Sequence, residues 1–271
     1  MLASQLESDS GMKLVDLLSD EEFRQRSANI REGKAESVAL RRLSHAFAEN
    51  PETVLQELVN AAVEFCGADS AGISLEEPEN ATFRWIVVAG SFSQYLNGRT
   101  PRGYSPCGTC IDAGRPQHYQ VTQPYYDFLG VTAEPILDGL LIPWANESLR
   151  GTLWAVSHRS EQAFSFDDYE LLSSLADFAS IVVRHQHQQM LIHESEHARG
   201  VAEMANQLAH RINNPLQSLT NTIYLARHGA GDVEGLLVQA ETDLMRLSDQ
   251  VAKLLNTAER LKPANERQHQ P

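Results

Sequence analysis

The chain has 271 residues, of which 42% are hydrophobic and 21% charged, a composition typical of a folded protein rather than a disordered one. Its formal net charge of −14 argues against a surface that binds nucleic acid or an anionic membrane, because such surfaces use clustered positive charge. We therefore expect neither nucleic acid nor membrane among its partners.

The first residues do not show the basic and apolar regions of a signal peptide, and no run of about 18 apolar residues could span a membrane. We therefore expect a cytoplasmic protein. In that reducing compartment the three cysteines, Cys66, Cys107 and Cys110, are expected to be thiols.

The length predicts more than one structural unit. In chain order we expect a loosely attached polar leader over residues 1–35, a mixed domain over 36–190, a linker helix with a helical hairpin over 191–262, and a disordered tail over 263–271.

Apolar residues spaced by three and four predict helices from Glu36 onward. Asn50 and Pro51 are typical of a helix start, as the N-cap and the first helical residue, and Gly67 is typical of a helix end. The sequence therefore predicts one helix before Asn50 and a second one between Pro51 and Gly67.

Short runs rich in β-branched and aromatic residues follow. They predict four strands, at residues 70–75, 83–89, 139–144 and 151–157. The last two are separated by turn residues and predict a hairpin. Residues 91–137, between the second and third runs, are rich in Gly, Pro and Tyr; we interpret them as an irregular stretch outside the core that carries a binding site or a lid.

Helical spacing begins again at Phe166 and hardly stops until Arg227, which is long for a globular protein and typical of a signalling helix or a coiled coil. Residues 229–231, Gly-Ala-Gly, interrupt it, and Asp232 is expected to cap a last helix. Apolar residues of that helix repeat at alternating steps of three and four, the pattern of a helical bundle. They are Leu237, Ala240, Leu244, Leu247, Val251, Leu254, Ala258 and Leu261.

This order of elements, with GRTPRGYSPCGTCIDAGRPQ in the middle and GTLWAVS near the end, resembles a GAF domain over about residues 36–190. The general pattern of that family is matched by Gly151, Phe164 and Asp168. The resemblance implies a sensory domain with an α+β fold, in which an antiparallel sheet carries helices on one face and a small-molecule pocket on the other. Since the cysteine and histidine pattern that attaches a bilin is not matched, we expect no covalent bilin.

Two histidine motifs follow the GAF-like region. His193-Glu-Ser-Glu-His197 fits the HExxH pattern of zinc peptidases. Its surroundings, RHQHQQMLIHESEHARG, are polar, and the remaining sequence offers no strand-edged cleft around it. We interpret it as a solvated helix face and assign no metal site.

The second motif centres on His210. At about 100° per residue, His210 lies on the opposite side of the helix from the apolar residues Leu208 and Ile212, and therefore points outward. Further inward positions are Ala205, Leu219, Ile223 and Ala226. Asn214 lies on the same face as His210, and Pro215 loosens the helix beside it. A solvent-accessible imidazole on a rigid scaffold is what phosphoryl acceptance requires.

The residues His210-Arg-Ile-Asn-Asn214-Pro-Leu look like the H-box of sensor histidine kinases, and residues 195–262 resemble their dimerisation and histidine-phosphotransfer hairpin. The resemblance implies that His210 accepts a phosphoryl group and that Asn214 orients water for receiver dephosphorylation. It also implies a homodimer whose hairpins form a four-helix bundle. The implied partners are a response-regulator receiver domain, a separate histidine kinase, or both.

The sequence departs from that family in two ways. Arg211 stands where an acidic residue usually assists the histidine, and a guanidinium cannot serve as a base. We also expect no ATP-binding domain in this chain, because few residues follow the hairpin. The sequence therefore favours histidine-kinase-like phosphotransfer or receiver dephosphorylation over autokinase activity. The alternative is a non-catalytic dimerisation or adaptor module that regulates a separate histidine kinase.

Cys107 and Cys110 form a CxxC pair that has two interpretations. The first is a structural turn that opens a short helix. The second is a redox or metal-sensing site, for which Cys66, His118 and His158 are candidate further ligands.

Overall fold

The computed structural model describes residues 10–26, 35–228 and 232–260, and divides the chain into two compact units, Met1–Met190 and Leu191–Pro271. The strands are β1 (Met12–Asp16), β2 (Ser70–Glu77), β3 (Thr82–Gly90), β4 (Arg99–Pro101), β5 (Gln117–Val121), β6 (Ile136–Ala145) and β7 (Arg150–Ser157). The α-helices are α2 (Glu21–Arg24), α3 (Ala35–Glu49), α4 (Val54–Cys66), α5 (Pro106–Ala113), α6 (Gln123–Leu129), α7 (Phe166–Arg227) and α8 (Val233–Arg260). Short 3-10 turns are η1 (Leu17–Ser19), η2 (Pro78–Asn80) and η3 (Ser91–Tyr95).

The strands form one antiparallel sheet in the order β1-β5-β6-β7-β2-β3-β4. The four strands predicted from β-rich runs are β2, β3, β6 and β7, and the last two form the predicted hairpin. Its turn is closed by Asn146, whose Oδ1 accepts the backbone N–H of Leu149 at 2.9 Å. The predicted α+β fold with an antiparallel sheet is confirmed.

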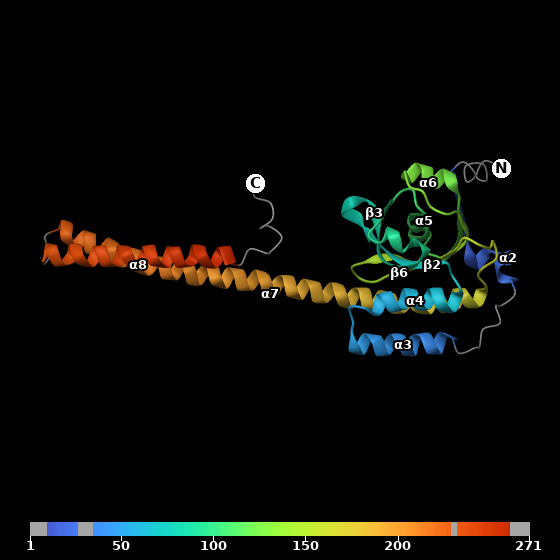
Figure 1. Ribbon diagram of the computed structural model, residues 1–271, viewed down its shortest axis with the longest axis horizontal. Coiled ribbons are helices and arrows are strands. Elements are labelled where there is room, and N and C mark those ends of the chain that lie inside the picture. Colours follow the sequence, from blue (N-terminus) through green and yellow to red (C-terminus); the bar gives the residue numbers. More distant parts are fainter. Residues whose placement is uncertain (1–9, 27–34, 229–231, 261–271) are drawn as a thin grey trace. The chain divides into compact units, whose positions relative to one another are not determined.

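Helices cover the two faces of the sheet differently. Helix α4 and the first turns of α7 pack on one face, α3 lies outside α4, and α5 and α6 lie on the other face (Figure 1). The α4 face holds the larger core, which includes Leu58, Ile73, Leu153 and Leu172, all fully buried. Aromatic side chains dominate the opposite face.

Helix α4 ends as predicted, at Gly67 in the left-handed conformation with φ 63°. The predicted start of this helix at Asn50 and Pro51 is wrong, because α4 begins at Val54 and residues 51–53 form a turn. Asn50 is still bonded to the preceding helix, since its N–H donates to the carbonyl of Ala46 at 2.8 Å. It therefore closes α3 instead of capping α4.

Residues 10–26 differ from the predicted loose leader. Strand β1 pairs along β5, and Leu17 and Phe23 are 0% exposed. The prediction failed because β1 is held by backbone hydrogen bonds, which leave no sequence pattern, and because only a few apolar side chains complete the docking. Residues 1–9 and 27–34 of that leader lie outside the described part of the chain.

Residues 91–137 also differ from the prediction, since they contain β4, α5, β5, α6 and the start of β6. The Gly and Pro residues that suggested irregular chain are helix caps. Pro106 opens α5 behind the N-cap Ser105, and Gly114 and Gly130 end α5 and α6 with φ of 61° and 66°. The stretch therefore forms part of the folded domain.

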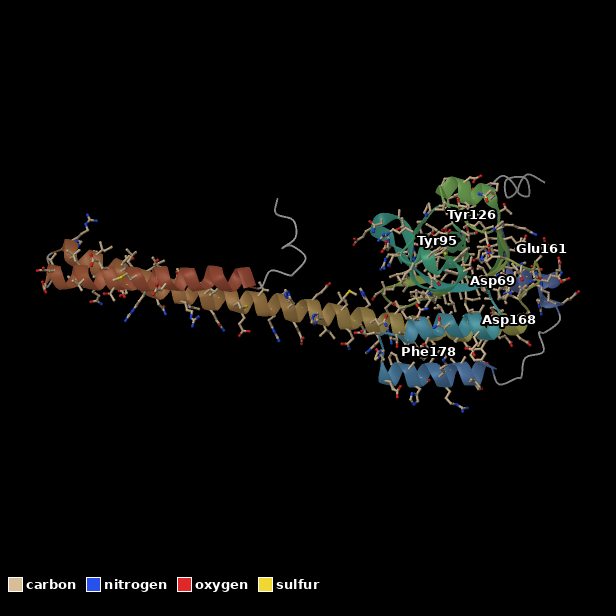
Figure 2. The ribbon with its side chains drawn as sticks, in the orientation of Figure 1. Asp69, Tyr95, Tyr126, Glu161, Asp168 and Phe178 are labelled. Atoms are coloured by element: carbon tan, nitrogen blue, oxygen red, sulfur yellow. The ribbon has the colours of Figure 1, made fainter. Side chains whose placement is uncertain are left out.

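The three residues that match the GAF pattern, Gly151, Phe164 and Asp168, lie at tightly packed positions. A Cβ at Gly151 would collide with the carbonyl oxygen of Ser74, so no larger residue fits between the paired strands. Phe164 is buried, and Asp168 accepts hydrogen bonds from the backbone and hydroxyl of Ser165 at the start of α7. Gly151 lies at the start of β7, and Asp168 lies in the first turn of the long helix (Figure 2).

The second unit contains the C-terminal part of α7 and helix α8 as a hairpin. Its half-buried seam includes predicted positions, namely Leu208, Ile212, Leu219 and Ala226 of α7 and Ala240 and Leu247 of α8. Ser218 donates to Asp243 across the seam at 2.6 Å. The predicted break at residues 229–231, the tail over 263–271 and the side chains beyond position 249 lie outside the described residues.

Other residues predicted to face inward do not do so within one chain. Leu237 is 56% exposed, Leu244 is 55% exposed, and Ile223 and Ala205 are exposed as well. The helical spacing of three and four residues spans a wide stripe, so it does not decide which edge of that stripe meets the partner helix.

Among the helices in the described ranges, none combines the length and the apolarity needed to cross a bilayer.

Docking of residues 10–26 can be tested at Phe23. Replacing this fully buried ring by alanine (Phe23→Ala) should lower the free energy of unfolding by about 3–5 kcal/mol, because the ring leaves a cavity. The matched control is Leu18→Ala, at a side chain that is 42% exposed on the same segment, with an expected change below about 0.5 kcal/mol. Urea denaturation measures both values, and equal stability of the two variants would contradict the docked arrangement.

Candidate functional site

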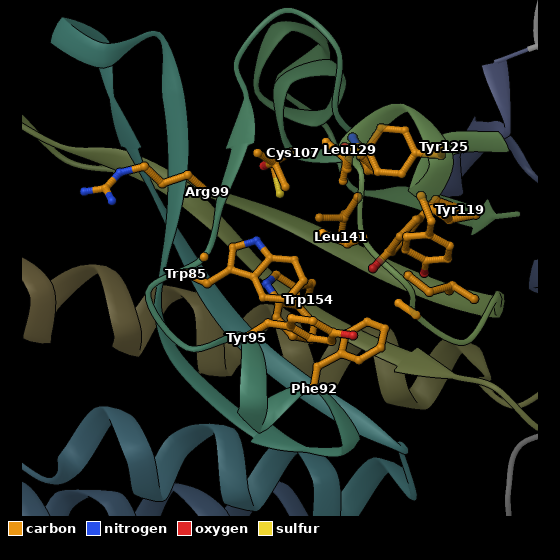
Figure 3. A pocket seen from close by; sticks show the side chains of 18 residues that line it. Trp85, Phe92, Tyr95, Arg99, Cys107, Tyr119, Tyr125, Leu129, Leu141 and Trp154 are labelled. Atoms are coloured by element: carbon orange, nitrogen blue, oxygen red, sulfur yellow. The ribbon is translucent and has the colours of Figure 1, made fainter. Parts of the chain in front are cut away.

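A deep cavity lies on the face of the sheet opposite α4, between the strands and the segments of residues 91–136. It has an empty volume of about 800 Å³, part of it in a mouth open to solvent. We call it the aromatic pocket (Figure 3). Its lining residues are Trp85, Phe92, Tyr95, Gly98, Arg99, Thr100, Pro106, Cys107, Tyr119, Val121, Tyr125, Tyr126, Leu129, Val131, Ala133, Ile136, Leu141 and Trp154.

Aromatic rings form two walls of this pocket. Trp85 stands at the centre of one wall, stacked on Phe92 with ring centroids 5.9 Å apart and tilted against Trp154 at 4.9 Å. Tyr119 and Tyr125 belong to the other side, as Figure 3 shows. Such walls offer both faces and edges of rings, the two surfaces by which aromatic groups contact one another.

Three buried polar atoms in this lining have no hydrogen-bond partner in the described part of the chain. They are Trp85 Nε1, Thr100 Oγ1 and the Tyr126 hydroxyl. A buried donor without a partner costs about 1–3 kcal/mol. Proteins bury few such groups, so three in one cavity set this region apart from an ordinary core.

The charged residue of the pocket is paired with a carboxylate outside the lining. Arg99 is the one charged residue of the lining, and its Nε donates to Glu77 at 2.8 Å. Hydrogen bonds from Arg99 and then from Arg84 lower the pKa of Glu77 to about 2. Glu77 is therefore ionised at neutral pH and pairs with both guanidiniums, those of Arg84 and Arg99.

Cys107 and Cys110 lie in α5, as the first interpretation of the CxxC pair predicts. Cys107 lines the pocket, where its Sγ lies 3.3 Å from the Thr152 hydroxyl that donates to it. Burial raises the pKa of both thiols, which disfavours the thiolate that redox and metal chemistry need.

The candidate further metal ligands are not brought to the cysteine pair. Cys66 lies on the α4 face of the sheet, and His118 is held by Asp138, with Nε2 and Oδ1 2.6 Å apart. His158 contacts the carbonyl of Pro135 through Nδ1 at 2.8 Å. In the ranges that the structure describes, no group of three or more His, Cys, Asp or Glu residues has metal-binding geometry.

His210 and Asn214 are both exposed on α7, while Leu208 and Ile212 face the hairpin seam. The side chain of His210 therefore points away from its own hairpin, with Pro215 inside the helix one turn later. His193 and His197 are exposed on the same helix.

Sequence patterns did not identify the pocket residues. Trp85 and Trp154 belonged to predicted strands, but nothing indicated which face they occupy. Tyr119 alternates with Val121 in β5, a period of two that is too short to stand out among Gly and Pro residues. The density of tyrosines between positions 95 and 126 was the one available signal.

Comparisons with known proteins give a family and a set of folds. A family model described as GAF domain matches residues 48–184. No curated protein matches the chain.

Among solved structures, the GAF domain of an Acinetobacter phosphoenolpyruvate-protein phosphotransferase shares 16% identity over 58% of this chain and 97% of that chain, with a TM-score of 0.48. A free methionine-R-sulfoxide reductase from Neisseria meningitidis in complex with its substrate shares 19% identity over 61% and 98%, with a TM-score of 0.47. The second GAF domain of DevS from Mycobacterium smegmatis shares 19% over 53% and 99%, with a TM-score of 0.42.

The burial of the cysteines predicts their reactivity. The native protein should show almost no thiol titre with a disulfide reagent such as Ellman's reagent at pH 8, because all three cysteines are buried and raised pKa values keep Cys107 and Cys110 protonated. In guanidinium chloride three thiols should react. Rapid reaction of one or two thiols in the native protein would instead support the redox interpretation.

Proposed function

Because the family model matches just over half of the chain, the chain belongs to the GAF domain family, whose members are signalling sensor modules, and we propose that it links ligand binding in the aromatic pocket to phosphotransfer at His210. In this proposal the protein acts in two-component signalling. A small molecule occupies the pocket, α7 carries the change, and His210 receives a phosphoryl group from a separate histidine kinase or exchanges one with a receiver domain.

The observation that carries the sensor half is the pocket with its three unpartnered polar atoms. Ligand sites combine an apolar lining with a few polar groups that fix orientation. A bound molecule would supply the missing hydrogen bonds and would thereby stabilise the ligand-bound arrangement of the pocket over the free one.

Strands β6 and β7 support a route from the pocket to α7. Leu141 and Trp154 face the pocket, whereas their neighbours Leu140 and Leu153 belong to the core that includes the first turns of α7. Two hydrogen bonds add to this contact at Ser180 of α7. Its hydroxyl donates to the carbonyl of Ala145 at 3.3 Å, and its carbonyl accepts from the side chain of Asn146 at 3.2 Å. A shift of these strands would therefore act directly on the helix that bears His210.

Exposure of His210 supports the phosphotransfer half, since an incoming phosphoryl group needs an unobstructed imidazole nitrogen. The phosphoryl group would pass from the aspartyl phosphate of a receiver, or from a kinase, to that nitrogen, and the reverse step would return it. Arg211 cannot accept a proton, so we propose no autokinase activity here. Asn214, exposed one turn after His210, is proposed to orient water when a receiver is dephosphorylated.

A second apolar stripe supports a homodimer. Leu216 and Ile223 of α7 are seven residues apart, as are Leu237 and Leu244 of α8, and all four are at least 40% exposed. Spacing by seven is the repeat of a coiled coil. We propose that this stripe, which we call the outer stripe, packs against a second copy to form a four-helix bundle.

The phosphotransfer proposal is tested by labelling. Full-length protein incubated with a receiver domain carrying a ³²P-aspartyl phosphate should acquire an acid-labile label, and His210→Ala should lose it. His197→Ala is the matched control, because that histidine is exposed on the same helix, and it should keep the label. If the label persists in His210→Ala, or if no tested receiver or kinase labels the protein, the phosphotransfer role is wrong and the adaptor alternative is favoured.

The dimer is tested at the outer stripe. Leu244→Glu should convert the protein to monomers in sedimentation velocity, because it places a charge in the proposed contact. Arg246→Glu, which also changes an exposed residue of α8, should leave the dimer intact. A monomeric unmodified chain at micromolar concentration, or dissociation of both variants alike, would contradict this arrangement.

A further inference from the structure

Resting on the proposed sensor function, we propose that the ligand of the aromatic pocket is an uncharged, planar aromatic molecule whose ring nitrogens or carbonyl oxygens accept hydrogen bonds from Trp85 and Tyr126. The ligand class is inferred from the hydrogen-bond acceptors that the lining itself does not provide. It follows from the positions of the unpartnered atoms, from the rings around them and from the pairing of Arg99 with Glu77.

Two of the three polar atoms lie on one wall. Phe83 of β3 is paired with Thr100 of β4, and cross-strand partners point to the same face of a sheet. Trp85, two residues after Phe83, shares that face as well. The indole N–H of Trp85 and the hydroxyl of Thr100 are therefore neighbours on the strand side of the pocket.

The third polar atom comes from α6. Tyr126 is 5% exposed, and Thr100 on the strand side is 8% exposed, so neither hydroxyl reaches bulk water easily. Burial raises the pKa of Tyr126, which keeps the phenol protonated and able to donate. A molecule between these walls meets an indole donor on the strand side and a phenol donor from the helix, so it must offer acceptors to both.

Two other tyrosines of the lining already have hydrogen-bond partners. Tyr125 donates to the carbonyl of Tyr104 at 3.3 Å, and Tyr95 donates to the carbonyl of Thr132 at 2.6 Å. Among the fully buried polar side-chain atoms of the described lining, those of Trp85, Thr100 and Tyr126 are the ones without a partner. Tyr104, which lies outside the lining and donates to the carbonyl of Ser10 at 2.7 Å, provides a matched control.

The pairing of Arg99 with Glu77 disfavours an anionic ligand. Arg99 is bound to Glu77 and is half-exposed at the mouth, and no other lining residue is charged. A carboxylate or phosphate drawn into an apolar cavity would lose its hydration without a counterion. The stacked rings instead favour a flat aromatic body.

Unpartnered groups leave a signature in stability. If Tyr126 and Thr100 serve a ligand, the free protein carries them at a cost, and removing the polar atom should stabilise it. Tyr126→Phe and Thr100→Val should each raise the melting temperature of the ligand-free protein by about 2–4 °C. A lower melting temperature in both variants would show that these hydroxyls have partners within the protein and would overturn the assignment.

Binding is tested with three probes of one size, namely quinoxaline, naphthalene and quinoxaline-2-carboxylate, titrated calorimetrically into the full chain. Quinoxaline has two acceptors, naphthalene has none, and the carboxylate adds a charge. Tyr126→Phe and Trp85→Phe should each weaken quinoxaline binding by about 2- to 12-fold, which is the effect of one hydrogen bond. Naphthalene should change by less than about 2-fold, and Tyr104→Phe, at a tyrosine outside the lining, should affect neither compound.

Three results would overturn the proposal. The first is equal loss of quinoxaline and naphthalene in the variants, which would reduce the effect to packing. The second is tighter binding of the carboxylate than of quinoxaline, and the third is no binding of quinoxaline up to its solubility limit. Labelling of His210 uses none of these compounds, so loss of the ligand class with intact labelling separates this inference from the proposed function.

Discussion

The alternation of side chains along β6 and β7 is the constraint on which the first unit depends. Each strand presents one set of residues to α4 and α7 and the other set to the aromatic pocket, so Leu140 and Leu141 serve different faces. A slip of one residue would exchange these sets. A glycine also allows β2 and β7 to pair closely, because a Cβ at Gly72 would overlap the ring of Trp154. Core packing and pocket shape are thus decided together, which couples a molecule in the pocket to the helices behind the sheet.

Free-energy terms in this domain oppose one another. Large buried rings and the α4 core stabilise the fold, whereas the unpartnered atoms of Trp85, Thr100 and Tyr126 destabilise it. Isolated unpartnered groups occur in folded proteins, and Trp144 Nε1 on the α4 side is one. Three such groups in one cavity are the arrangement expected of a ligand site rather than of an ordinary core.

Sequence patterns predicted the parts of the fold that repeat. The β-rich runs of β2, β3, β6 and β7 and the long helical spacing of α7 were predicted. The order of the elements, together with the segments GRTPRGYSPCGTCIDAGRPQ and GTLWAVS, resembles a GAF domain, and that family is confirmed. Features held by backbone bonds or by single residues were missed, among them β1, β5 and the caps that made residues 91–137 look irregular. Residues 91–137 were expected to carry a binding site or a lid, and they supply most of the pocket lining. The shape of the pocket could not be predicted, because it joins residues of β3, β4, α5 and α6, whose proximity is decided only by the pairing of strands. Periodicity likewise could not choose between Leu247 and Leu244 as the residue facing α7, because they lie on adjacent edges of one stripe.

Asp138 connects the N-terminal segment at Arg26 to the start of the chain's longest described helix. This fully buried carboxylate accepts from Arg26 at 2.8 Å and from the backbone N–H groups of Ala163 and Phe164 just before α7, while its other oxygen binds His118. A fragment cut at the family boundary, residue 48, would lack Arg26 and β1. The carboxylate of Asp138 would then be buried without the guanidinium that pairs with it, which weakens the support of the start of α7. The edge of β5 would be unpaired and could pair with other chains. Fragments for crystallisation or solution studies of this domain should therefore begin before residue 10.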